Sequence, residues 1–290
     1  MHEIKSGEVV QLSPLVRRVV ANNPGAMTGA GTNTYIIGRD EVAILDPGPA
    51  DPAHVDVILD AVGTAHVRWI VVTHTHPDHS PSAALLVART GAELVGCVLV
   101  DDGHQDRSFI VDSNVRHGDL IVSREFTLEA IATPGHVANH FCFFLREEGQ
   151  VFTGDHIMGG STVVIIPPSG DMAEYLVSLE QLKQYPIKQL LPGHGNVIED
   201  PLGVIDGLIA HRLRRENKVI RVLRSRSEIS LVDLTPLVYD DVDAGLHLVA
   251  QVSLWAHLLK LEKEGRAIKT IEQHWLFGQQ LWRYVPSEVE

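Results

Sequence analysis

The segment THTHPDHS gathers four side chains that can bind metal ions into one short stretch. His74 and His76 are alternate residues that leave an apolar run. On an extended backbone they point to the same side and can share one ion. Asp78 and His79 follow a proline and can face a second ion. Histidine nitrogens and carboxylate oxygens are common zinc ligands, so we predict a metal centre here rather than isolated histidines in a surface loop.

Three more potential ligands follow predicted strands farther along the chain. His136 lies in TPGHVANH, Asp155 in VFTGDH and His194 in LLPGHG, each directly after a glycine. Strand ends converge at one edge of a sheet, and glycine lets the backbone approach closely. We therefore expect one site built from seven residues: His74, His76, Asp78, His79, His136, Asp155 and His194. His140 and His156 lie outside this pattern, and we expect them to support the ligands instead of binding metal.

The elements that must position these residues alternate between strand and helix patterns. Apolar runs predict strands at 34–45 (a hairpin), 67–72, 94–100, 120–131, 141–145, 151–153 and 187–191. Helical spacing predicts helices at 54–62, 81–90 and 172–184. Such an alternation indicates an α/β layered domain.

The pattern changes after Pro201 to long helical spacing. A helix is predicted at 245–263, followed by two short strands within 267–284. Helices followed by a small β-wing are typical of a winged helix. We therefore expect a catalytic domain over residues 1–204 and a winged-helix-like domain over residues 205–290.

Composition narrows the classes of function. The net charge is −13, and residues 1–204 hold 12 Lys and Arg against 25 Asp and Glu, which disfavours a broad basic surface for nucleic acid. No apolar run approaches the roughly 20 residues of a membrane span, and the N-terminus has no signal-peptide pattern. Cys97 and Cys142 lie in apolar segments and are expected to be free thiols. These features predict a cytoplasmic protein with no membrane partner, and they leave its oligomeric state open.

The ordered motifs resemble the metallo-β-lactamase superfamily. HxHxDH, a later histidine, TGD and then GHG follow one another over about residues 15–200. The resemblance implies an αββα sandwich with two divalent metal ions, zinc being expected and iron or manganese possible as alternatives. It implies that His74, His76 and His136 bind one ion and that Asp78, His79 and His194 bind the other. The carboxylate of Asp155 would bridge the two ions.

Segments outside the metal motif are similar to the β-lactamase-like protein 2 group. These segments are Asn23–Pro24, Gly31–Tyr35, Gly160–Thr162 and HLLKLEKEG near the C-terminus. Members of that group also carry a winged-helix-like tail. They have been linked to cleavage of single-stranded RNA, and related fungal enzymes to thioester hydrolysis during polyketide release.

We therefore expect a hydrolase in which a hydroxide bridging two metal ions attacks an ester, a thioester or a related bond of a small molecule. Asp78 is expected to act in catalysis by orienting that hydroxide. The alternative is an endoribonuclease, favoured by the seven Arg and Lys residues between His211 and Arg226. We prefer to interpret that stretch as a solvated helix face that also lines the domain junction. A non-catalytic DNA-binding regulator conflicts with the seven-residue ligand set.

Other reactions of the superfamily are less expected. Lactonases resembling this pattern place a tyrosine where Met158 stands, and glyoxalase II enzymes usually continue as GHEY where this chain has His194, Gly195 and Asn196. Antibiotic-cleaving members generally lack an aspartate in the position of Asp155. The sequence does not indicate which residues contact the substrate.

Overall fold

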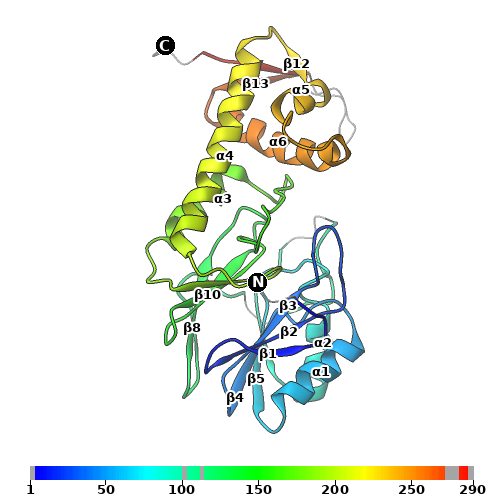
Figure 1. Ribbon diagram of the computed structural model, residues 1–290, viewed down its shortest axis with the longest axis vertical. Coiled ribbons are helices and arrows are strands. Elements are labelled where there is room, and N and C mark those ends of the chain that lie inside the picture. Colours follow the sequence, from blue (N-terminus) through cyan, green and yellow to red (C-terminus); the bar gives the residue numbers. More distant parts are fainter. Residues whose placement is uncertain (1–3, 100–102, 112–113, 272–280, 287–290) are drawn as a thin grey trace.

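The computed structural model describes residues 4–99, 103–111, 114–271 and 281–286. Two sheets pack face to face in the lower part of Figure 1, with helices on their outer faces, and a smaller C-terminal domain lies above them. The predicted αββα sandwich followed by helices and a small β-wing is confirmed.

The first sheet has six strands in chain order. They are β1 (Val9–Gln11), β2 (Val16–Val20), β3 (Asn33–Ile37), β4 (Glu41–Leu45), β5 (His66–Val71) and β6 (Glu93–Val95). The first four are antiparallel, whereas β5 and β6 join in parallel through α1 (Pro52–Val62) and α2 (Ser82–Thr90). Helix α1 begins where the Asp51 carboxylate accepts the backbone N–H of Ala53, with Pro52 in the first turn.

The second sheet has the order β11-β10-β9-β8-β7. Its strands are β7 (Leu120–Val122), β8 (Thr127–Ala132), β9 (Phe141–Leu145), β10 (Gln150–Gly154) and β11 (Gln189–Pro192). Strand β11 is parallel to β10, because α3 (Met172–Leu182) provides the crossover between them. The parallel pair brings the carboxyl ends of β10 and β11 to the same edge of the sheet.

Three apolar layers hold the sandwich together. Between the sheets, Tyr35 and Val71 of the first sheet pack with Phe143 and Phe152 of the second. A second layer joins α1 and α2 to the outer face of the first sheet, and a third joins α3 and the start of α4 to the outer face of the second. Burial of these side chains is the main stabilising contribution, at roughly 25 cal/mol per Å² of apolar surface.

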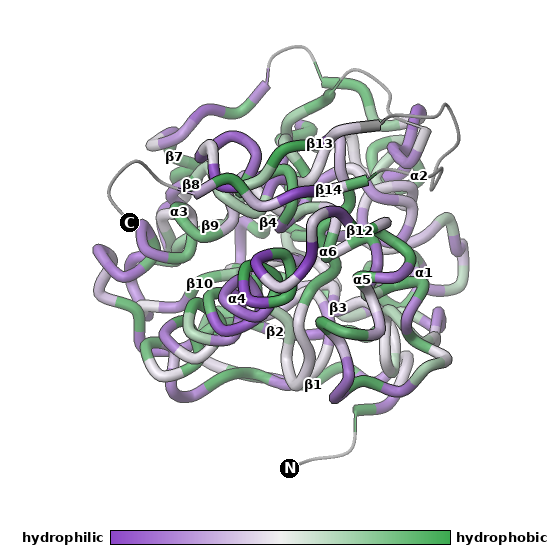
Figure 2. Tube along the Cα trace, turned by 90° about the horizontal axis from the view of Figure 1, so that it is seen from above, coloured by the Kyte–Doolittle hydropathy of each residue, from purple (hydrophilic) through white to green (hydrophobic). Residues whose placement is uncertain are grey.

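The C-terminal domain is built around a long helix that starts in the sandwich. Its elements are α4 (Pro201–Arg224), β12 (Ile229–Ser230), α5 (Leu231–Val238), the 3-10 turn η1 (Ala244–Leu246), α6 (His247–Lys263), β13 (Ala267–Ile271) and β14 (Leu281–Tyr284). Helix α4 runs from the sandwich into the upper domain in Figure 1, and in Figure 2 it is seen nearly end-on, with hydrophilic and hydrophobic residues along its turns. Residues 204 and 205, where we expected the domain boundary, thus lie inside one helix.

Two expectations about strands were wrong in detail, and two strands were missed. The strand predicted at 120–131 is two strands, because Ser123 Oγ accepts the N–H groups of Glu125 and Phe126 and turns the chain. The strand predicted at 94–100 ends at Val95, and Val100 lies outside the described residues. Strands β1 and β2 were not predicted.

Two further expectations concern the cysteines and membranes. Cys97 and Cys142 are both free, as predicted. Among the described residues, no helix is long and apolar enough to cross a membrane.

Candidate metal centre

The seven predicted ligands converge at one edge of the sandwich. His74, His76, Asp78 and His79 follow β5, His136 follows β8, Asp155 follows β10, and His194 follows β11. The glycines beside them allow this close approach. A Cβ added to Gly193 would lie only 2.8 Å from Cε1 of His79 and 3.1 Å from Oδ1 of Asp155. The sheet topology therefore brings together residues that are up to 120 positions apart.

Three histidines form the first cluster. Nε2 of His74 lies 2.9 Å from Nδ1 of His76, and Nε2 of His136 lies 3.2 Å from the same atom. His74 and His136 are buried, and His76 is half-buried. Three ring nitrogens aimed at one another are the arrangement expected of a metal site with nitrogen ligands.

The second cluster contains two histidines and an aspartate. Oδ2 of Asp78 lies 3.7 Å from Nε2 of His79 and 3.2 Å from Nε2 of His194. Asp155 stands between the clusters: its Oδ1 is 3.4 Å from Nε2 of His79, and its Oδ2 is 3.8 Å from Nε2 of His136. One carboxylate therefore presents one oxygen to each cluster.

Hydrogen bonds on the far side of the rings fix which nitrogen faces the centre. Nδ1 of His136 donates to the carbonyl of Val164 (2.8 Å), and Nδ1 of His194 donates to that of Gly31 (3.3 Å). A neutral imidazole has one N–H, so Nε2 in each ring keeps its lone pair. Such supporting hydrogen bonds are a regular feature of metal-binding histidines.

Asp46 is an important residue that the sequence did not point to. Its side chain is fully buried at the end of β4, and its Oδ2 lies 3.0 Å from Nδ1 of His79. Its Oδ1 accepts the backbone N–H of Thr73 (2.8 Å), and its Oδ2 accepts the Thr73 hydroxyl (2.8 Å). Because that hydroxyl has its hydrogen on Asp46, it accepts from Nδ1 of His74 (3.1 Å). Asp46 thus orients two ligands, directly and through Thr73.

The buried atoms of the second cluster lack other partners. Among the described residues, no hydrogen bond reaches Nε2 of His79, Nε2 of His194 or Oδ1 of Asp155, although all three atoms are buried. Buried polar atoms are normally satisfied, since an unpaired one costs about 1–3 kcal/mol. A divalent cation at the second cluster would satisfy these three atoms, and the converging ring nitrogens of the first cluster could hold a metal ion as well.

The electrostatics of the site agree with that fit. Burial holds the pKa of His74 well below its usual value and lowers that of His76 to about 4, so both rings are neutral. Burial would raise the pKa of Asp155, but the nearby His194 and His79 hold it well below its usual range. Burial would lower the pKa of His79 and of His194, but the carboxylates of Asp78 and Asp155 raise it, so a cation bound at the second cluster would displace protons from these two rings, as metal ions do at histidine ligands.

His140 and His156 extend the row of rings behind the clusters. Nε2 of His140 accepts the backbone N–H of Asp155 (3.2 Å), and its Nδ1 donates to Thr133 Oγ1 (2.9 Å). The His156 ring lies 4.9 Å from that of Tyr175, measured between centroids. Neither histidine belongs to a group of side chains arranged to hold a metal ion among the described residues. His140 therefore supports the backbone of Asp155.

Comparisons with known proteins match both parts of the chain. A model of the metallo-beta-lactamase superfamily matches residues 27–194, and one of the beta-lactamase associated winged helix domain matches residues 230–275. Beta-lactamase-like protein 2 homologs of Caenorhabditis elegans and Drosophila melanogaster are 33% and 34% identical over 89% of this chain, covering 87% and 91% of their own lengths. An atrochrysone carboxyl ACP thioesterase of Cryptosporiopsis sp. is 29% identical over 89% of this chain and 83% of its own length.

Solved structures share the fold over nearly the whole chain. A beta-lactamase domain protein from Burkholderia ambifaria superposes with a TM-score of 0.79 at 19% identity, over 98% of this chain and 95% of its own. A metallo-beta-lactamase family protein from Thermus thermophilus superposes with a TM-score of 0.75 at 19% identity, over 95% of this chain and all of its own. With the family match and the ligand geometry together, the chain belongs to the metallo-beta-lactamase superfamily and is a hydrolase related to the beta-lactamase-like protein 2 homologs.

Proposed function

We propose that this hydrolase uses two divalent metal ions, zinc in the first instance, to cleave a thioester or ester of a small molecule. The observation that carries the proposal is the position of Asp155, whose two carboxylate oxygens face different clusters. One tetrahedral site uses four ligands, and seven converging ligands exceed that number. Two adjacent sites sharing one carboxylate account for all seven.

The ligands divide between the two sites by proximity. His74, His76 and His136 would hold one ion, Asp78, His79 and His194 the other, and Asp155 would bridge them. When bound, a pair of divalent cations lowers the pKa of a water to near 7 and polarises the substrate oxygen. No serine or cysteine nucleophile is needed for such a reaction.

Asp78 is placed to orient the attacking water. Its side chain is 29% exposed, whereas that of Asp155 is 12% exposed, so Asp78 lies closer to the open side of the site. Burial would raise the pKa of Asp78, but His79 and His194 lower it to about 2, and the carboxylate is ionised at neutral pH. An ionised carboxylate accepts a hydrogen bond from water and keeps a lone pair of the water oxygen aimed at the substrate.

Support for a thioester comes from relatives that align with most of this chain. Two atrochrysone carboxyl ACP thioesterases, from Cryptosporiopsis sp. and Aspergillus novofumigatus, are 29% and 31% identical over 89% of this chain. A thioester carbonyl offers an electrophilic carbon and a good leaving group, so it suits a hydroxide nucleophile generated at neutral pH.

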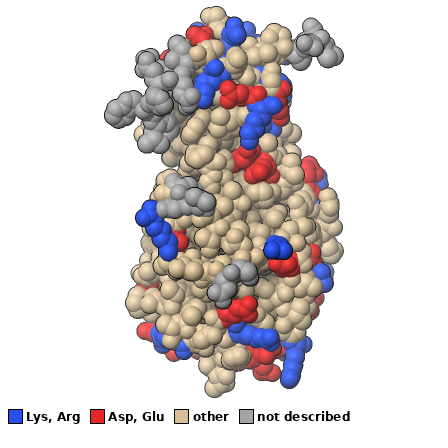
Figure 3. Space-filling model, turned by 180° about the vertical axis from the view of Figure 1, so that it is seen from behind, with Lys and Arg blue, Asp and Glu red and all other residues tan. Residues whose placement is uncertain are grey.

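The structure gives less support to the RNA alternative. Of the basic residues on α4, Arg212 and Arg215 are buried, and Arg215 forms an ion pair with Asp241 (2.7 Å). Lys218 pairs with Asp240, and the Arg224 guanidinium lies over the Tyr284 ring. On the face seen in Figure 3, basic and acidic side chains lie beside one another rather than forming one basic patch. Four of the six basic residues of α4 are therefore held by partners within the protein.

A substrate panel tests the proposal. Metal-reconstituted protein would be assayed with an acyl N-acetylcysteamine thioester, the matching oxygen ester, a lactone, a β-lactam and single-stranded RNA. We expect the thioester to be hydrolysed fastest, with loss of activity on chelation and recovery when zinc is restored. Hydrolysis that survives complete metal removal, or faster cleavage of RNA than of the acyl substrates, would overturn it.

A further inference from the structure

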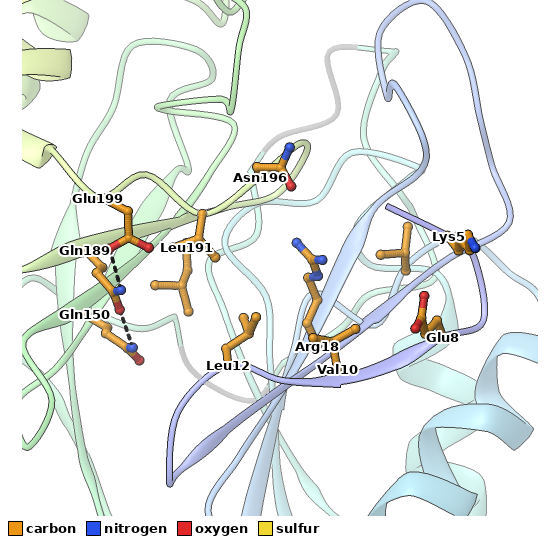
Figure 4. Close-up of a pocket in the computed structure, with 12 residues that line it drawn as sticks. Lys5, Glu8, Val10, Leu12, Arg18, Gln150, Gln189, Leu191, Asn196 and Glu199 are labelled. Atoms are coloured by element: carbon orange, nitrogen blue, oxygen red, sulfur yellow. Dashed lines mark hydrogen bonds between the residues drawn. The ribbon is translucent and has the colours of Figure 1, made fainter. Parts of the chain in front are cut away.

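A separate cavity opens at the edge of the sandwich between β1 and β2 of one sheet and β10 and β11 of the other (Figure 4). Its volume is about 660 Å³. Sites for small molecules typically measure about 300–1,000 Å³. Its apolar lining residues are Val10, Leu12, Val20, Leu191 and Val197. The cavity is thus large enough and apolar enough to hold a small organic molecule.

Arg18 brings a positive charge into this cavity from the inner face of β2. In Figure 4 its side chain rises from the strand into the space below Asn196. The residue is only 7% exposed. Within the described part of the chain, no hydrogen bond or ion pair involves the Arg18 side chain, and its Nε is buried without a partner. The guanidinium therefore lacks the partners that a buried cation normally has.

The acids around the cavity do not neutralise this charge. Glu8 and Glu199 lie on its exposed rim. Glu199 accepts a hydrogen bond from Gln189 Nε2 (2.7 Å), and the Oε1 of Gln189 accepts one from Gln150 Nε2 (2.8 Å). The Glu199 carboxylate is therefore bound to the side-chain amide of Gln189 and forms no ion pair with Arg18. An isolated buried charge is costly, so an anion that pairs with it is strongly favoured.

We propose that the cavity is a binding site for a small organic carboxylate with an apolar body. The carboxylate would lie against Arg18, because a guanidinium fork matches two carboxylate oxygens in a bidentate pair. The apolar body would pack on the valine and leucine wall. A singly charged ligand fits better than phosphate, since Glu8 and Glu199 at the rim repel a dianion more strongly. The seven proposed metal ligands do not line the cavity, so this site does not depend on the metal-dependent reaction.

The first test measures binding of octanoate to the metal-loaded protein by isothermal titration calorimetry. Octylamine tests the sign of the charge, because it has the same apolar chain with a positive head group. Inorganic phosphate tests the apolar component, because it is a more highly charged anion without an apolar body. Octanoate should bind more tightly than both, and Arg18→Met should weaken it by roughly tenfold to a hundredfold. Arg68→Met is the matched control, because Arg68 is an exposed arginine at the opposite edge of the sandwich. That control should bind octanoate as the parent protein does.

A second test uses two substitutions of Val10, one of which places a negative charge beside Arg18. Val10 lies directly opposite Arg18 in the β1–β2 register, so a side chain there shares its face. Val10→Glu should pair with Arg18, abolish octanoate binding and raise the melting temperature. Val10→Gln has nearly the same shape without the charge, and it should do neither. This pair decides the question even where Arg18→Met fails to fold.

Several outcomes would overturn the proposal. One is the absence of octanoate binding, and another is equal binding by the parent protein, Arg18→Met and Val10→Glu. Phosphate binding as tightly as octanoate would contradict the apolar component. Binding that disappears on chelation of the metals but survives Arg18→Met would assign octanoate to the metal centre instead.

Discussion

The carboxylate of Asp46 lies 3.0 Å from Nδ1 of His79, on the side of the ring opposite the metal-facing nitrogen. The interaction is fully buried and fixes Nδ1 as the donor. Carboxylates in this position raise the basicity of a ligating histidine and hold its ring in place. Asp46 therefore belongs to the candidate metal centre although it is not one of the seven proposed ligands.

Replacing Asp46 should weaken metal binding at one of the two sites. Asp46→Asn keeps the shape of the side chain but removes its charge beside His79. We expect the affinity for the ion at Asp78, His79 and His194 to fall about tenfold to a hundredfold. Titration against a chelating indicator would measure it, with Asp51→Asn, a helix cap outside the centre, as the control. Unchanged affinity at both sites would contradict the role of Asp46.

Arg212 should couple the C-terminal domain to the metal centre. Its NH2 group donates to the carbonyl of Val163 (2.5 Å), next to the Val164 carbonyl that fixes His136. Arg212→Met should lower the free energy of unfolding by about 2 kcal/mol, since a buried charged hydrogen bond is lost. It should also weaken metal binding at the cluster that contains His136.

The neighbouring Arg214 provides a control for that experiment. It lies on the same helix and is exposed. Arg214→Met should leave both the unfolding curve and the metal affinity unchanged. If Arg212→Met were equally silent, the contact with Val163 would have no part in positioning His136.

His54 should make stability depend on pH. Its Nε2 lies 2.9 Å from Thr34 Oγ1, whose hydroxyl donates to the Asp46 carbonyl, so His54 is the donor in its neutral form. Burial lowers the pKa of His54 from 6.5 to about 4. Because the pKa of His54 is lower in the folded protein than in the unfolded chain, protonation favours the unfolded chain. The stabilising contribution of neutral His54 is therefore present above pH 6.5 and is lost as pH falls toward 4. The loss between pH 7.5 and pH 5 is on the order of 2 kcal/mol.

Urea unfolding at those two pH values would measure the His54 contribution. His54→Gln retains an N–H donor but does not titrate. The stability difference between pH 7.5 and pH 5 should be smaller for His54→Gln than for the parent protein. If the free energy of unfolding changed equally with pH in the two proteins, His54 would make no contribution to the pH dependence of stability.

The exposed arginines of α4 and its end should be dispensable for hydrolysis of a small substrate. Arg214, Arg221 and Arg226 are exposed, whereas Lys218 and Arg215 are held by Asp240 and Asp241. The triple change of these three exposed arginines to glutamine should leave thioester turnover nearly unchanged. In parallel, the binding of single-stranded RNA to the parent protein and to the triple variant would be measured as a function of salt concentration. An RNA complex whose salt dependence is flattened by the triple change would promote the ribonuclease alternative.

The sequence predicted the seven converging residues because each follows a strand or lies in a compact motif. Asp46 escaped prediction since its role depends on β4 lying beside β5, a pairing that no local pattern displays. Strand β2 escaped because VRRVV does not alternate, and its Arg18 points inward among apolar residues. The inward-pointing Arg18 is also one of the charged residues that line the cavity beside β2.

The basic stretch between residues 211 and 226 differs in part from the solvated helix face that we expected from the sequence, because Arg212 and Arg215 are buried. Seven Arg and Lys residues between 211 and 226 suggested a surface for a polyanion. The fold buries Arg212 and Arg215, and the acids that follow α5, Asp240 and Asp241, pair with Lys218 and Arg215. Charge count in one helix therefore says little until its tertiary partners are known.

Metal content tests the central claim most directly. Protein purified from zinc-supplemented medium would be analysed by inductively coupled plasma mass spectrometry, beside Asp155→Ala and His156→Ala. Seven ligands around one bridging carboxylate predict close to two ions per chain in the parent protein and in His156→Ala, and about one or fewer in Asp155→Ala. A reproducible value of about one ion or fewer in the parent protein, or an unchanged content in Asp155→Ala, would contradict a dinuclear centre bridged by Asp155.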